Sequence, residues 1–374
     1  MTTDTDRTET ARTDHSTTDA FVERFFSAVL GAQFTQAAYL GDRLGWYRAL
    51  ADAGALTSVE LAARTATAER YAREWLEHQA VCGVLTVDNA DDAAAAPQQR
   101  RFRLSAGHAE VLTSEESLSY LMPLARMMVG LGKHMDALLD AYRTGGGVSW
   151  AEFGEDPREA QGAQNRPMFL RALGTDYLPR VPEVHAELRA GGRVADIGCG
   201  LGWSSIGIAL AYPGAAVDGF DLDGPSVETA TRNAHEAGVS DRVRFHHVEA
   251  SAVTTPLTEQ TYDLVTAFEC VHDLPDPVSF LATMRRLAGD TGTVMVMDER
   301  VAETFDAPGD ETEQLMYGFS LMCCLPDGLS HQPSEGTGTV MRPAVLEGYA
   351  RRAGFAGIEV LPIEDDFFRF YRLA

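Results

Sequence analysis

The sequence predicts an α/β protein, with a doubly wound, mostly parallel sheet preceded by a mostly helical domain. Three observations lead to this prediction. The first half carries apolar residues at helical spacing, whereas from residue 191 onward short strand-like runs alternate with helical stretches. The last two strand-like runs leave no room for a helix between them, which predicts an antiparallel hairpin.

The composition is that of a globular protein with a strongly acidic surface. The chain has 374 residues, 45% of them hydrophobic, and a net charge of −24, so we expect a substantial core in either two domains or one large domain with an extension. This charge repels phosphate backbones and anionic lipids, so we expect neither nucleic acid nor a membrane as partner. The five cysteines lack disulfide spacing, no apolar run could span a bilayer, and the first residues lack a signal-peptide core. We therefore expect a soluble, cytoplasmic protein.

The amino-terminal region, residues 19–118, is predicted to be a winged-helix domain. Its order of elements, three helical segments followed by strand, loop and strand, is typical of that fold. The expected elements are a disordered tail at 1–18, two amphipathic helices joined near Gly41–Gly45, a helix started by a capping-box pattern at Thr57, a helix at about 67–82, and strands at 83–87 and 101–104 around a loop.

The remaining chain divides into a connector and the sheet domain. Residues 119–190 predict a helical connector or lid, broken at Pro123, at Gly145–Gly147 and at Pro167. Residues 191–374 predict the sheet. Its seven expected strands lie at 193–197, 216–220, 243–248, 262–268, 293–297, 358–362 and 367–373.

The first of these strands runs into a glycine-rich turn, Asp196-Ile-Gly198-Cys-Gly200-Leu-Gly202. Glycines permit positive φ and let a ligand approach the backbone closely. A dinucleotide-binding turn would place its third glycine one residue later, where this chain has Trp203. A carboxylate at the mouth of the turn, Asp196, would repel a pyrophosphate and attract an ammonium. The turn therefore favours S-adenosylmethionine, which carries an ammonium and a sulfonium and no phosphate.

Acids also follow the next two strands. Asp221 ends the second strand, where a carboxylate can accept hydrogen bonds from both ribose hydroxyls. The alternative is that Asp221 caps the helix that starts near Ser226. Glu249 follows the third strand and is a candidate acceptor for the adenine amino group, with a surface carboxylate on a loop as the alternative.

On these motifs, residues 190–300 resemble the class I S-adenosylmethionine-dependent methyltransferases. The whole layout is similar to a mycobacterial-type subgroup of small-molecule methyltransferases with a winged-helix domain in front. The resemblance implies that the first turn holds the methionine part, Asp221 the ribose and Glu249 the adenine, although the family more often has Asp at position 249. The implied cofactor-binding residues are Asp196, Gly198, Cys199, Gly200, Gly202, Asp221, Leu222, Glu249, Ala250, Phe268 and Glu269.

His272 follows the fourth strand, and ligands gather at the carboxyl ends of parallel strands. A histidine can accept a hydroxyl proton near neutral pH, which is needed if the methyl acceptor is a hydroxyl but not if it is a thiolate or a free amine. Glu269, before it, is a second inward candidate, against the sulfonium or the ribose. The alternatives are a strand-end hydrogen bond for Glu269 and a loop histidine that caps the next helix for His272.

The His272-Asp273 pair is similar to the catalytic segment of winged-helix O-methyltransferases. In those enzymes an acid after the fifth strand orients the histidine, and Asp298 or Glu299 matches that place. The chain departs from their pattern at Leu274, where they have Trp.

Two methionine-rich segments, 121–135 and 315–331, are candidate walls of an apolar acceptor pocket, with plain core as the alternative. Asn165–Phe169 is a candidate lid over the cofactor, or a helix start with Pro167 in its first turn. Cys323-Cys324 and His331 lack metal-ligand spacing, so no metal site is expected. The candidate pocket residues are Met127, His134, Tyr317, Met322 and Cys323.

The sequence thus predicts methyl transfer from S-adenosylmethionine, with S-adenosylhomocysteine as product, to a small apolar or aromatic molecule in secondary metabolism. His272 would be the base, with Asp298 and Glu299 beside it, and the amino-terminal domain would form a homodimer. One alternative is a winged-helix transcription regulator with a ligand-sensing methyltransferase-like domain. Its recognition helix would carry Glu69, Glu74 and Glu77 against two arginines and no basic stripe. Another alternative is a methyltransferase fold that catalyses a different reaction.

Overall fold

The structure, a computed structural model, describes residues 5–88, 96–248 and 261–374, and for residues 5–16 it describes only the backbone. The chain divides into two units, Met1–Val129 and Gly130–Ala374. The boundary falls inside the expected connector, most of which belongs to the second unit. Among the described helices, none has both the length and the apolar character needed to cross a membrane.

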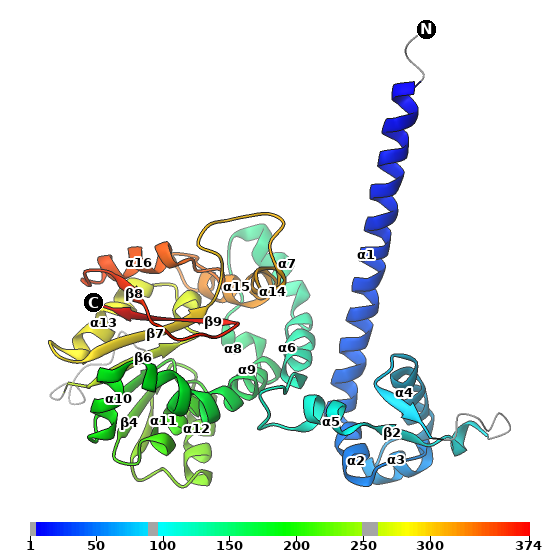
Figure 1. Ribbon diagram of the computed structural model, residues 1–374, viewed down its shortest axis with the longest axis horizontal. Helices are drawn as coiled ribbons and strands as arrows, with labels where there is room; N and C mark the ends of the chain where they lie inside the picture. The colour runs from blue at the N-terminus through cyan, green and yellow to red at the C-terminus, as the bar shows by residue number, and fades with distance from the viewer. Residues whose placement is uncertain (1–4, 89–95, 249–260) are drawn as a thin grey trace. The chain divides into compact units, whose positions relative to one another are not determined.

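The first unit has the expected winged-helix order of elements (Figure 1). The predicted capping box is confirmed, because Thr57 Oγ1 accepts from the Glu60 N–H at 3.2 Å while the Glu60 carboxylate accepts from the Thr57 N–H at 2.8 Å. The two short strands pair antiparallel. The elements are α1 (Thr5–Arg43), α2 (Trp46–Ala53), α3 (Ser58–Thr65), α4 (Glu69–Val81), β1 (Leu85–Val87), η1 (Pro97–Gln99), β2 (Phe102–Leu104), α5 (Ala106–Thr113) and the larger part of α6 (Met122–Gly132).

The predicted disordered tail at 1–18 is wrong over its described part, because α1 begins at Thr5. The few apolar residues before Phe21 suggested a tail. However, no proline or glycine interrupts residues 5–30. Once a helix is nucleated, each added residue gains a backbone hydrogen bond, so the helix that begins in the apolar segment can extend toward the amino end.

The carboxyl end of α1 is held by α4 and α6. Trp75 donates its ring N–H to the Ala37 carbonyl at 2.8 Å. Arg126 forms a largely buried ion pair with Asp42, with Nε 2.6 Å from the carboxylate. A Cβ at Gly41 would lie 2.3 Å from the Trp75 ring, so this crossing of helices needs glycine.

The second unit contains the sheet and its covering helices. Its elements before the sheet are α7 (Met135–Thr144), α8 (Trp150–Phe153), α9 (Glu155–Met168), η2 (Phe169–Tyr177), η3 (Leu178–Arg180) and α10 (Pro182–Arg189). Those of the sheet region are β3 (Arg193–Ile197), α11 (Trp203–Ala211), β4 (Ala216–Asp221), α12 (Gly224–Glu236), β5 (Val243–His247), β6 (Leu264–Phe268), η5 (Val271–Asp273), α13 (Pro277–Ala288), β7 (Thr293–Glu299), α14 (Glu311–Phe319), η6 (Ser320–Cys324), α15 (Leu325–Leu329), α16 (Pro343–Arg352), β8 (Ile358–Val360) and β9 (Phe368–Leu373).

All seven predicted strands are present in one sheet of order β5-β4-β3-β6-β7-β9-β8. Strands β3 to β7 are parallel, while β9 runs antiparallel to both β7 and β8, as the terminal hairpin predicts. After β3 the chain adds β4 and then β5 on one side of β3, and it then crosses to the other side of β3 to form β6. The point where strand order reverses therefore lies at the carboxyl ends of these three strands, where doubly wound sheets bind ligands.

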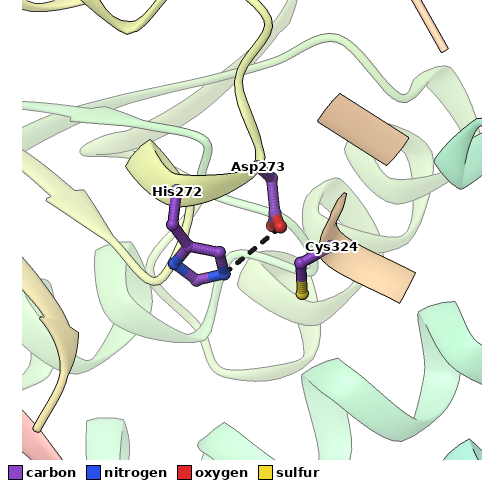
Figure 2. A group of neighbouring side chains, drawn as sticks. All are labelled: His272, Asp273 and Cys324. Carbon is purple, nitrogen blue, oxygen red and sulfur yellow. Dashed lines mark ion pairs between the residues drawn. The ribbon is translucent and has the colours of Figure 1, made fainter. Parts of the chain in front are cut away.

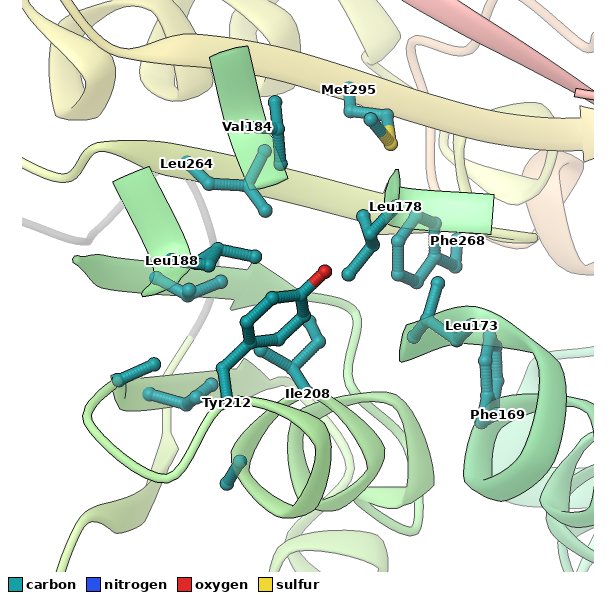
Figure 3. Packing of buried hydrophobic residues seen from close by; sticks show 14 of the residues in the cluster. Phe169, Leu173, Leu178, Val184, Leu188, Ile208, Tyr212, Leu264, Phe268 and Met295 are labelled. Atoms are coloured by element: carbon teal, nitrogen blue, oxygen red, sulfur yellow. The ribbon is translucent and has the colours of Figure 1, made fainter. Parts of the chain in front are cut away.

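Both faces of the sheet are covered by helices (Figure 1). On one face, shown in Figure 3, Val184 and Leu188 of α10 and Ile208 of α11 pack against the sheet. Their partners there include Leu264 of β6 and Met295 of β7. The opposite face carries a second core, to which α13 and α16 contribute. The strands are therefore buried on both sides, which explains their continuous apolar runs.

One predicted helix break is wrong. Helix α9 runs through Pro167 and continues as the π-helical segment η2, instead of breaking or starting there. Proline has no N–H to donate to the preceding turn, and the wider π-helical turns begin two residues later, at Phe169. The break predicted at Gly145–Gly147 is confirmed, because Gly145 ends α7 with φ of 78°.

Replacing Phe370 with alanine should lower the free energy of unfolding by about 3–5 kcal/mol, because the side chain is fully buried and would leave a cavity. Urea denaturation followed by circular dichroism measures this change. Phe367→Ala is the control from the same carboxyl-terminal segment, since its side chain is 49% exposed, and it should change stability by less than about 1 kcal/mol. Equal losses in the two variants would contradict this assignment of the core.

Candidate active site

The glycine turn after β3 is built from left-handed residues. Gly198, Gly200 and Gly202 have φ of 74°, 50° and 81°. A Cβ at Gly198 would lie 2.7 Å from Cys270 Sγ, so a larger residue does not fit there. The Gly200 N–H donates to the Asp221 carboxylate at 2.7 Å, which ties the turn to the end of β4. The predicted turn is thus present, and a hydrogen bond joins it to the end of the second strand.

Asp196 has a different role from the predicted one. Its carboxylate is 1% exposed and lies behind the turn instead of at its mouth. It accepts hydrogen bonds from the hydroxyls of Ser204 at 2.5 Å, Ser205 at 2.7 Å and Thr266 at 2.8 Å. Because these hydroxyls engage both oxygens, Asp196 joins β3, α11 and β6.

A cleft opens beside the turn, at the carboxyl ends of β3, β4 and β6. Phe268 and Phe169 form part of its wall, with ring centroids 5.7 Å apart. Asn165 and Phe169 of the predicted lid segment also line it. The predicted cofactor residues that line this cleft are Gly198, Cys199, Gly200, Asp221, Phe268 and Glu269.

Asp221 faces the cleft with its carboxylate anchored from behind. One oxygen accepts from Gly200 and the other accepts from the Asp223 N–H at 2.8 Å. The alternative that Asp221 caps α12 is wrong, because Asp223 accepts from the Ser226 N–H and fills that position. Burial raises the pKa of Asp221, while the two backbone hydrogen bonds act in the opposite direction. Each oxygen keeps a lone pair for a ribose hydroxyl.

Other predicted cofactor residues lie elsewhere. Gly202 caps the start of α11 and packs against Phe245, where a Cβ would lie 2.5 Å from the ring. Leu222 is 66% exposed and does not line the cleft, because the chain turns outward after β4. Glu249 and Ala250 lie outside the described residues, so the adenine contact stays a prediction.

Sequence reasoning missed most of the polar wall contributed by α9. Arg158, Gln161 and Asn165 line the cleft from one face of this helix. Arg158 forms a bidentate ion pair with Asp223, at 2.5 and 3.0 Å. The spacing of three and four residues between these polar side chains is the signal that could have identified this face. Trp150, Trp203 and Ser226 also line the cleft without having been predicted.

Glu269 is the most unusual residue of the cleft. It has φ of 53°, and the only other non-glycine residue with positive φ in the described chain is Ala66. Such backbone strain costs of order 1–3 kcal/mol and collects at functional sites. One carboxylate oxygen, Oε2, accepts from the amides of Gln161 at 2.7 Å and Asn165 at 3.1 Å. The other, Oε1, is buried without a hydrogen-bond partner. Burial and the nearby negative charge of Glu299 raise the pKa of Glu269 to about 8.

His272 lies beside this cleft region and is 2% exposed. Its Nδ1 is 2.9 Å from Asp298 and 3.0 Å from Glu299, the two predicted acids, which form the end of β7. Its Nε2 is 3.2 Å from the Asp273 carboxylate, the contact drawn in Figure 2. The alternative that His272 caps the next helix is wrong, since Asp276 accepts from the Ser279 N–H at the start of α13.

The protonation of His272 follows from these contacts. Burial alone would lower the pKa of the imidazole, but the charges of Asp273, Asp298 and Glu299 raise it well above the usual value. The protonated imidazole is therefore favoured in this arrangement. Burial also raises the pKa of Glu299 to about 8, and Asp298 adds to that effect. The raised pKa values of His272 and Glu299 mean that proton binding reduces the buried negative charge of this cluster.

Two groups in the described chain bring metal-binding atoms within 4.8 Å of one another: His272 with Asp273 and Cys324, and His272 with Asp298 and Glu299. Figure 2 shows the first, in which Cys324 lies beside Asp273. Both groups share the same imidazole, and each of its nitrogens already lies against a carboxylate. In both groups the imidazole thus pairs with a carboxylate.

The predicted acceptor-pocket residues do not form one site. Met127 belongs to the first unit and is buried there. His134 packs its ring edge-on to Phe153, with centroids 5.5 Å apart. Tyr317 lines a separate, apolar hollow together with residues such as Phe305 and Leu321. Cys323 is buried in η6, and Met322 is half-buried beside it.

Comparison with known proteins agrees with this geometry. A family profile described as "Methyltransferase domain" matches residues 188–334, and one described as "Rv2258c-like winged HTH domain" matches residues 32–114. A ubiquinone biosynthesis O-methyltransferase from Aromatoleum aromaticum is 31% identical over 175 residues, which cover 46% of this chain and 67% of that protein. The chain belongs to the class I S-adenosylmethionine-dependent methyltransferases.

Two further comparisons give a likeness of sequence and a likeness of fold. The 27-O-demethylrifamycin SV methyltransferase of Amycolatopsis mediterranei is 40% identical over 89 residues, 24% of this chain and 32% of that protein. The solved structure of human N-acetylserotonin methyltransferase in complex with SAM has a TM-score of 0.63 at 19% identity and covers 94% of this chain and 96% of its own, a likeness of fold. For three curated relatives the matched segment spans less than half of the relative's length, at 32%, 40% and 45%.

The described cleft fits S-adenosylmethionine in its chemistry. The backbone at Gly200 leaves open space where a Cβ would stand, and Asp221 presents acceptors to a ribose. The buried, unpartnered Oε1 of Glu269 would be stabilised by a positively charged group or a hydrogen-bond donor. The chain's own residues thus offer backbone approach, hydroxyl recognition and a carboxylate for a cationic ligand.

Replacing Asp221 with alanine should weaken S-adenosylmethionine binding by roughly 10- to 100-fold, because each lost hydrogen bond to a charged acceptor is worth about 1.5–3 kcal/mol. Isothermal titration calorimetry measures the dissociation constant. Asp241→Ala is the control, since this carboxylate is 75% exposed and lies on the loop before β5. Equal affinity in wild type and Asp221→Ala would exclude Asp221 as a cofactor ligand.

Proposed function

We propose that this methyltransferase transfers a methyl group to a hydroxyl oxygen of a small apolar or aromatic molecule, with His272 as the base. The observation that carries the proposal is the position of His272, three residues after Glu269 of the cofactor cleft and held through Nδ1 by Asp298 at 2.9 Å. A histidine held in this way presents Nε2 as its proton-accepting atom.

In the proposed reaction, different residues of the cleft bind different parts of the cofactor. Asp221 holds the ribose, Gly198 and Gly200 let the ligand approach the backbone, and Glu269 faces the positively charged end. When bound, S-adenosylmethionine supplies a methyl group already activated by its sulfonium and is converted into S-adenosylhomocysteine. The protein must therefore mainly align the acceptor oxygen with the methyl group and accept one proton.

Asp273 controls access to the base. Its carboxylate covers Nε2 at 3.2 Å, and its side chain is 31% exposed, so it has room to move aside. As the acceptor oxygen gains the methyl group, its hydroxyl proton would pass to Nε2 of His272. Because His272 must be deprotonated first and its pKa is raised, the rate should increase with pH above the usual histidine range.

The names of relatives support an oxygen acceptor. The two relatives described above are named as O-methyltransferases or as acting on an O-demethyl compound. We place the reaction in the cytoplasm and in secondary metabolism. The five free cysteines support a reducing compartment.

The proposed homodimer is supported by α1. Its middle part exposes two adjacent rows of apolar residues, spaced by four, along one stripe. The stripe consists of Phe21, Val22, Phe25, Phe26, Val29, Leu30 and Phe34, with exposures from 38% to 64%. An apolar surface of this extent on a chain with net charge −24 favours burial against the same stripe of a second copy, because an isologous contact avoids any need for a partner of opposite charge.

A transcription regulator is the less supported alternative. The two arginines at the start of α4, where a recognition helix would lie, pair with glutamates of the same helix: Arg70 with Glu74 and Arg73 with Glu69. These pairs leave little positive charge there for phosphates. A different reaction on the same fold would keep the cofactor cleft and would not need His272 as base.

Replacing His272 with alanine should lower kcat for hydroxyl acceptors by about 100- to 10,000-fold, the usual contribution of a general base. A panel of phenols assayed by mass spectrometry measures this, and calorimetry should show that S-adenosylmethionine still binds. His235→Ala, in the exposed last turn of α12, is the matched control and should keep wild-type turnover. Undiminished turnover in His272→Ala would remove this residue as the base.

Replacing both Phe25 and Phe26 with aspartate should convert the protein from dimer to monomer, because two charges would be buried in the apolar contact. Analytical ultracentrifugation should show wild type at twice the 40.6 kDa chain mass and the double variant at the single mass. Val81→Asp, an exposed apolar site on α4, should remain dimeric. A monomeric wild type would overturn the proposed assembly.

A further inference from the structure

Glu269 presents a buried carboxylate to the cofactor cleft without a cation to balance it. Its Oε2 is satisfied by two neutral amides, those of Gln161 and Asn165, and its Oε1 has no partner. In the described chain no lysine or arginine pairs with it, since the arginine on the same wall, Arg158, is engaged by Asp223. The left-handed backbone at Glu269 holds the side chain in this position despite its strain.

The surroundings of Glu269 are mostly acidic. A buried carboxylate among other carboxylates is expected to carry a proton unless a positive group approaches it. His272 is the nearby group that can carry positive charge, and its own nitrogens lie against other acids. The charges that act on Glu269 are those of Glu299 of β7 and His272 of η5. The other titratable groups of its cleft are Cys199 of the glycine turn, Asp221 of β4 and Arg158 of α9, while Asp273 and Asp298 contact His272.

We propose that Glu269 is protonated before the methyl donor binds and releases its proton when the donor's positive charge occupies the cleft. Through this ionisation the side chain distinguishes the sulfonium donor from its product, whose sulfur is neutral. The inference rests on the proposed function, because it assumes that S-adenosylmethionine is the ligand of this cleft. It goes further by assigning donor-over-product selectivity to one side chain and linking it to pH.

The direction of the pH effect follows from the balance of charge. Below pH 8, Glu269 is mainly protonated, because burial and Glu299 raise its pKa to about 8. A cation beside Oε1 favours the ionised form, so binding and proton release are linked. Lowering the pH therefore weakens binding of the donor, by up to about tenfold per pH unit below 8. The product keeps the ammonium but lacks the sulfonium, so it should release fewer protons and depend less on pH.

Calorimetric titration of the full-length protein with S-adenosylmethionine tests the proposal without any turnover. Titrations at pH 7 in phosphate and in Tris, whose ionisation enthalpies differ, give the number of protons released. Wild type should release protons at pH 7, and the number released should fall as the pH rises through the raised pKa of Glu269. S-adenosylhomocysteine should release clearly less at pH 7.

Two variants identify the group that titrates. Glu269→Gln keeps the shape and an acceptor for the amides of α9, and it should abolish proton release and bring the affinities for donor and product to within about threefold. Glu236→Gln, an exposed position on α12, is the matched control and should behave as wild type. Circular dichroism establishes that both variants are folded.

The outcomes separate the two proposals. Absence of any S-adenosylmethionine binding to wild type would overturn the proposed function. Binding without proton release, or release that Glu269→Gln leaves unchanged, would overturn the role of Glu269 alone. If Glu269→Gln fails to fold, the pH dependence of donor and product binding in wild type still decides: equal slopes for the two ligands contradict the proposal.

Discussion

The arrangement of the strand ends that line the cofactor cleft depends on one buried carboxylate. Asp196 is enclosed by the hydroxyls of Ser204, Ser205 and Thr266. These hydrogen bonds join the first strand of the sheet to the helix after the glycine turn and to the fourth strand. Glu269 and His272 follow that fourth strand, so the position of both relative to the turn rests on this contact. A buried carboxylate with three hydroxyl donors is stable as an anchor, whereas an unsatisfied one would disrupt the core.

The second constraint is an excess of buried negative charge around a single imidazole. Asp273, Asp298 and Glu299 contact His272, and Glu269 lies close enough to Glu299 for their charges to interact. In a site shielded from water such charges cannot all be ionised together, so protons distribute among them. In the proposed reaction, binding of a cation in the cleft and transfer of a proton to His272 would therefore act on one connected set of groups. This connection follows from burial, which removes solvent screening.

Much of the fold followed from local patterns. The seven strands, the terminal hairpin and the capping box at Thr57 were predictable because each depends on neighbours in the chain. The helical start of α1 was not, because composition indicates how little a segment can bury but not whether an adjoining helix will extend through it. The run of α9 through Pro167 was missed for a similar reason, since its lost hydrogen bond is accommodated by the tertiary setting.

The features of the candidate site also fall into two groups, those that local sequence predicts and those that only the tertiary structure sets. By itself the sequence determined the glycine turn, Asp221 at the second strand end, and a histidine after the fourth strand, because strand ends and turns are set by local residue order. Only the tertiary structure decided that Asp196 faces inward, that Gln161 and Asn165 hold Glu269 across more than 100 residues of chain, and that three acids surround His272. Burial and through-space charge depend on which surfaces meet. No periodicity in the chain encodes those distances.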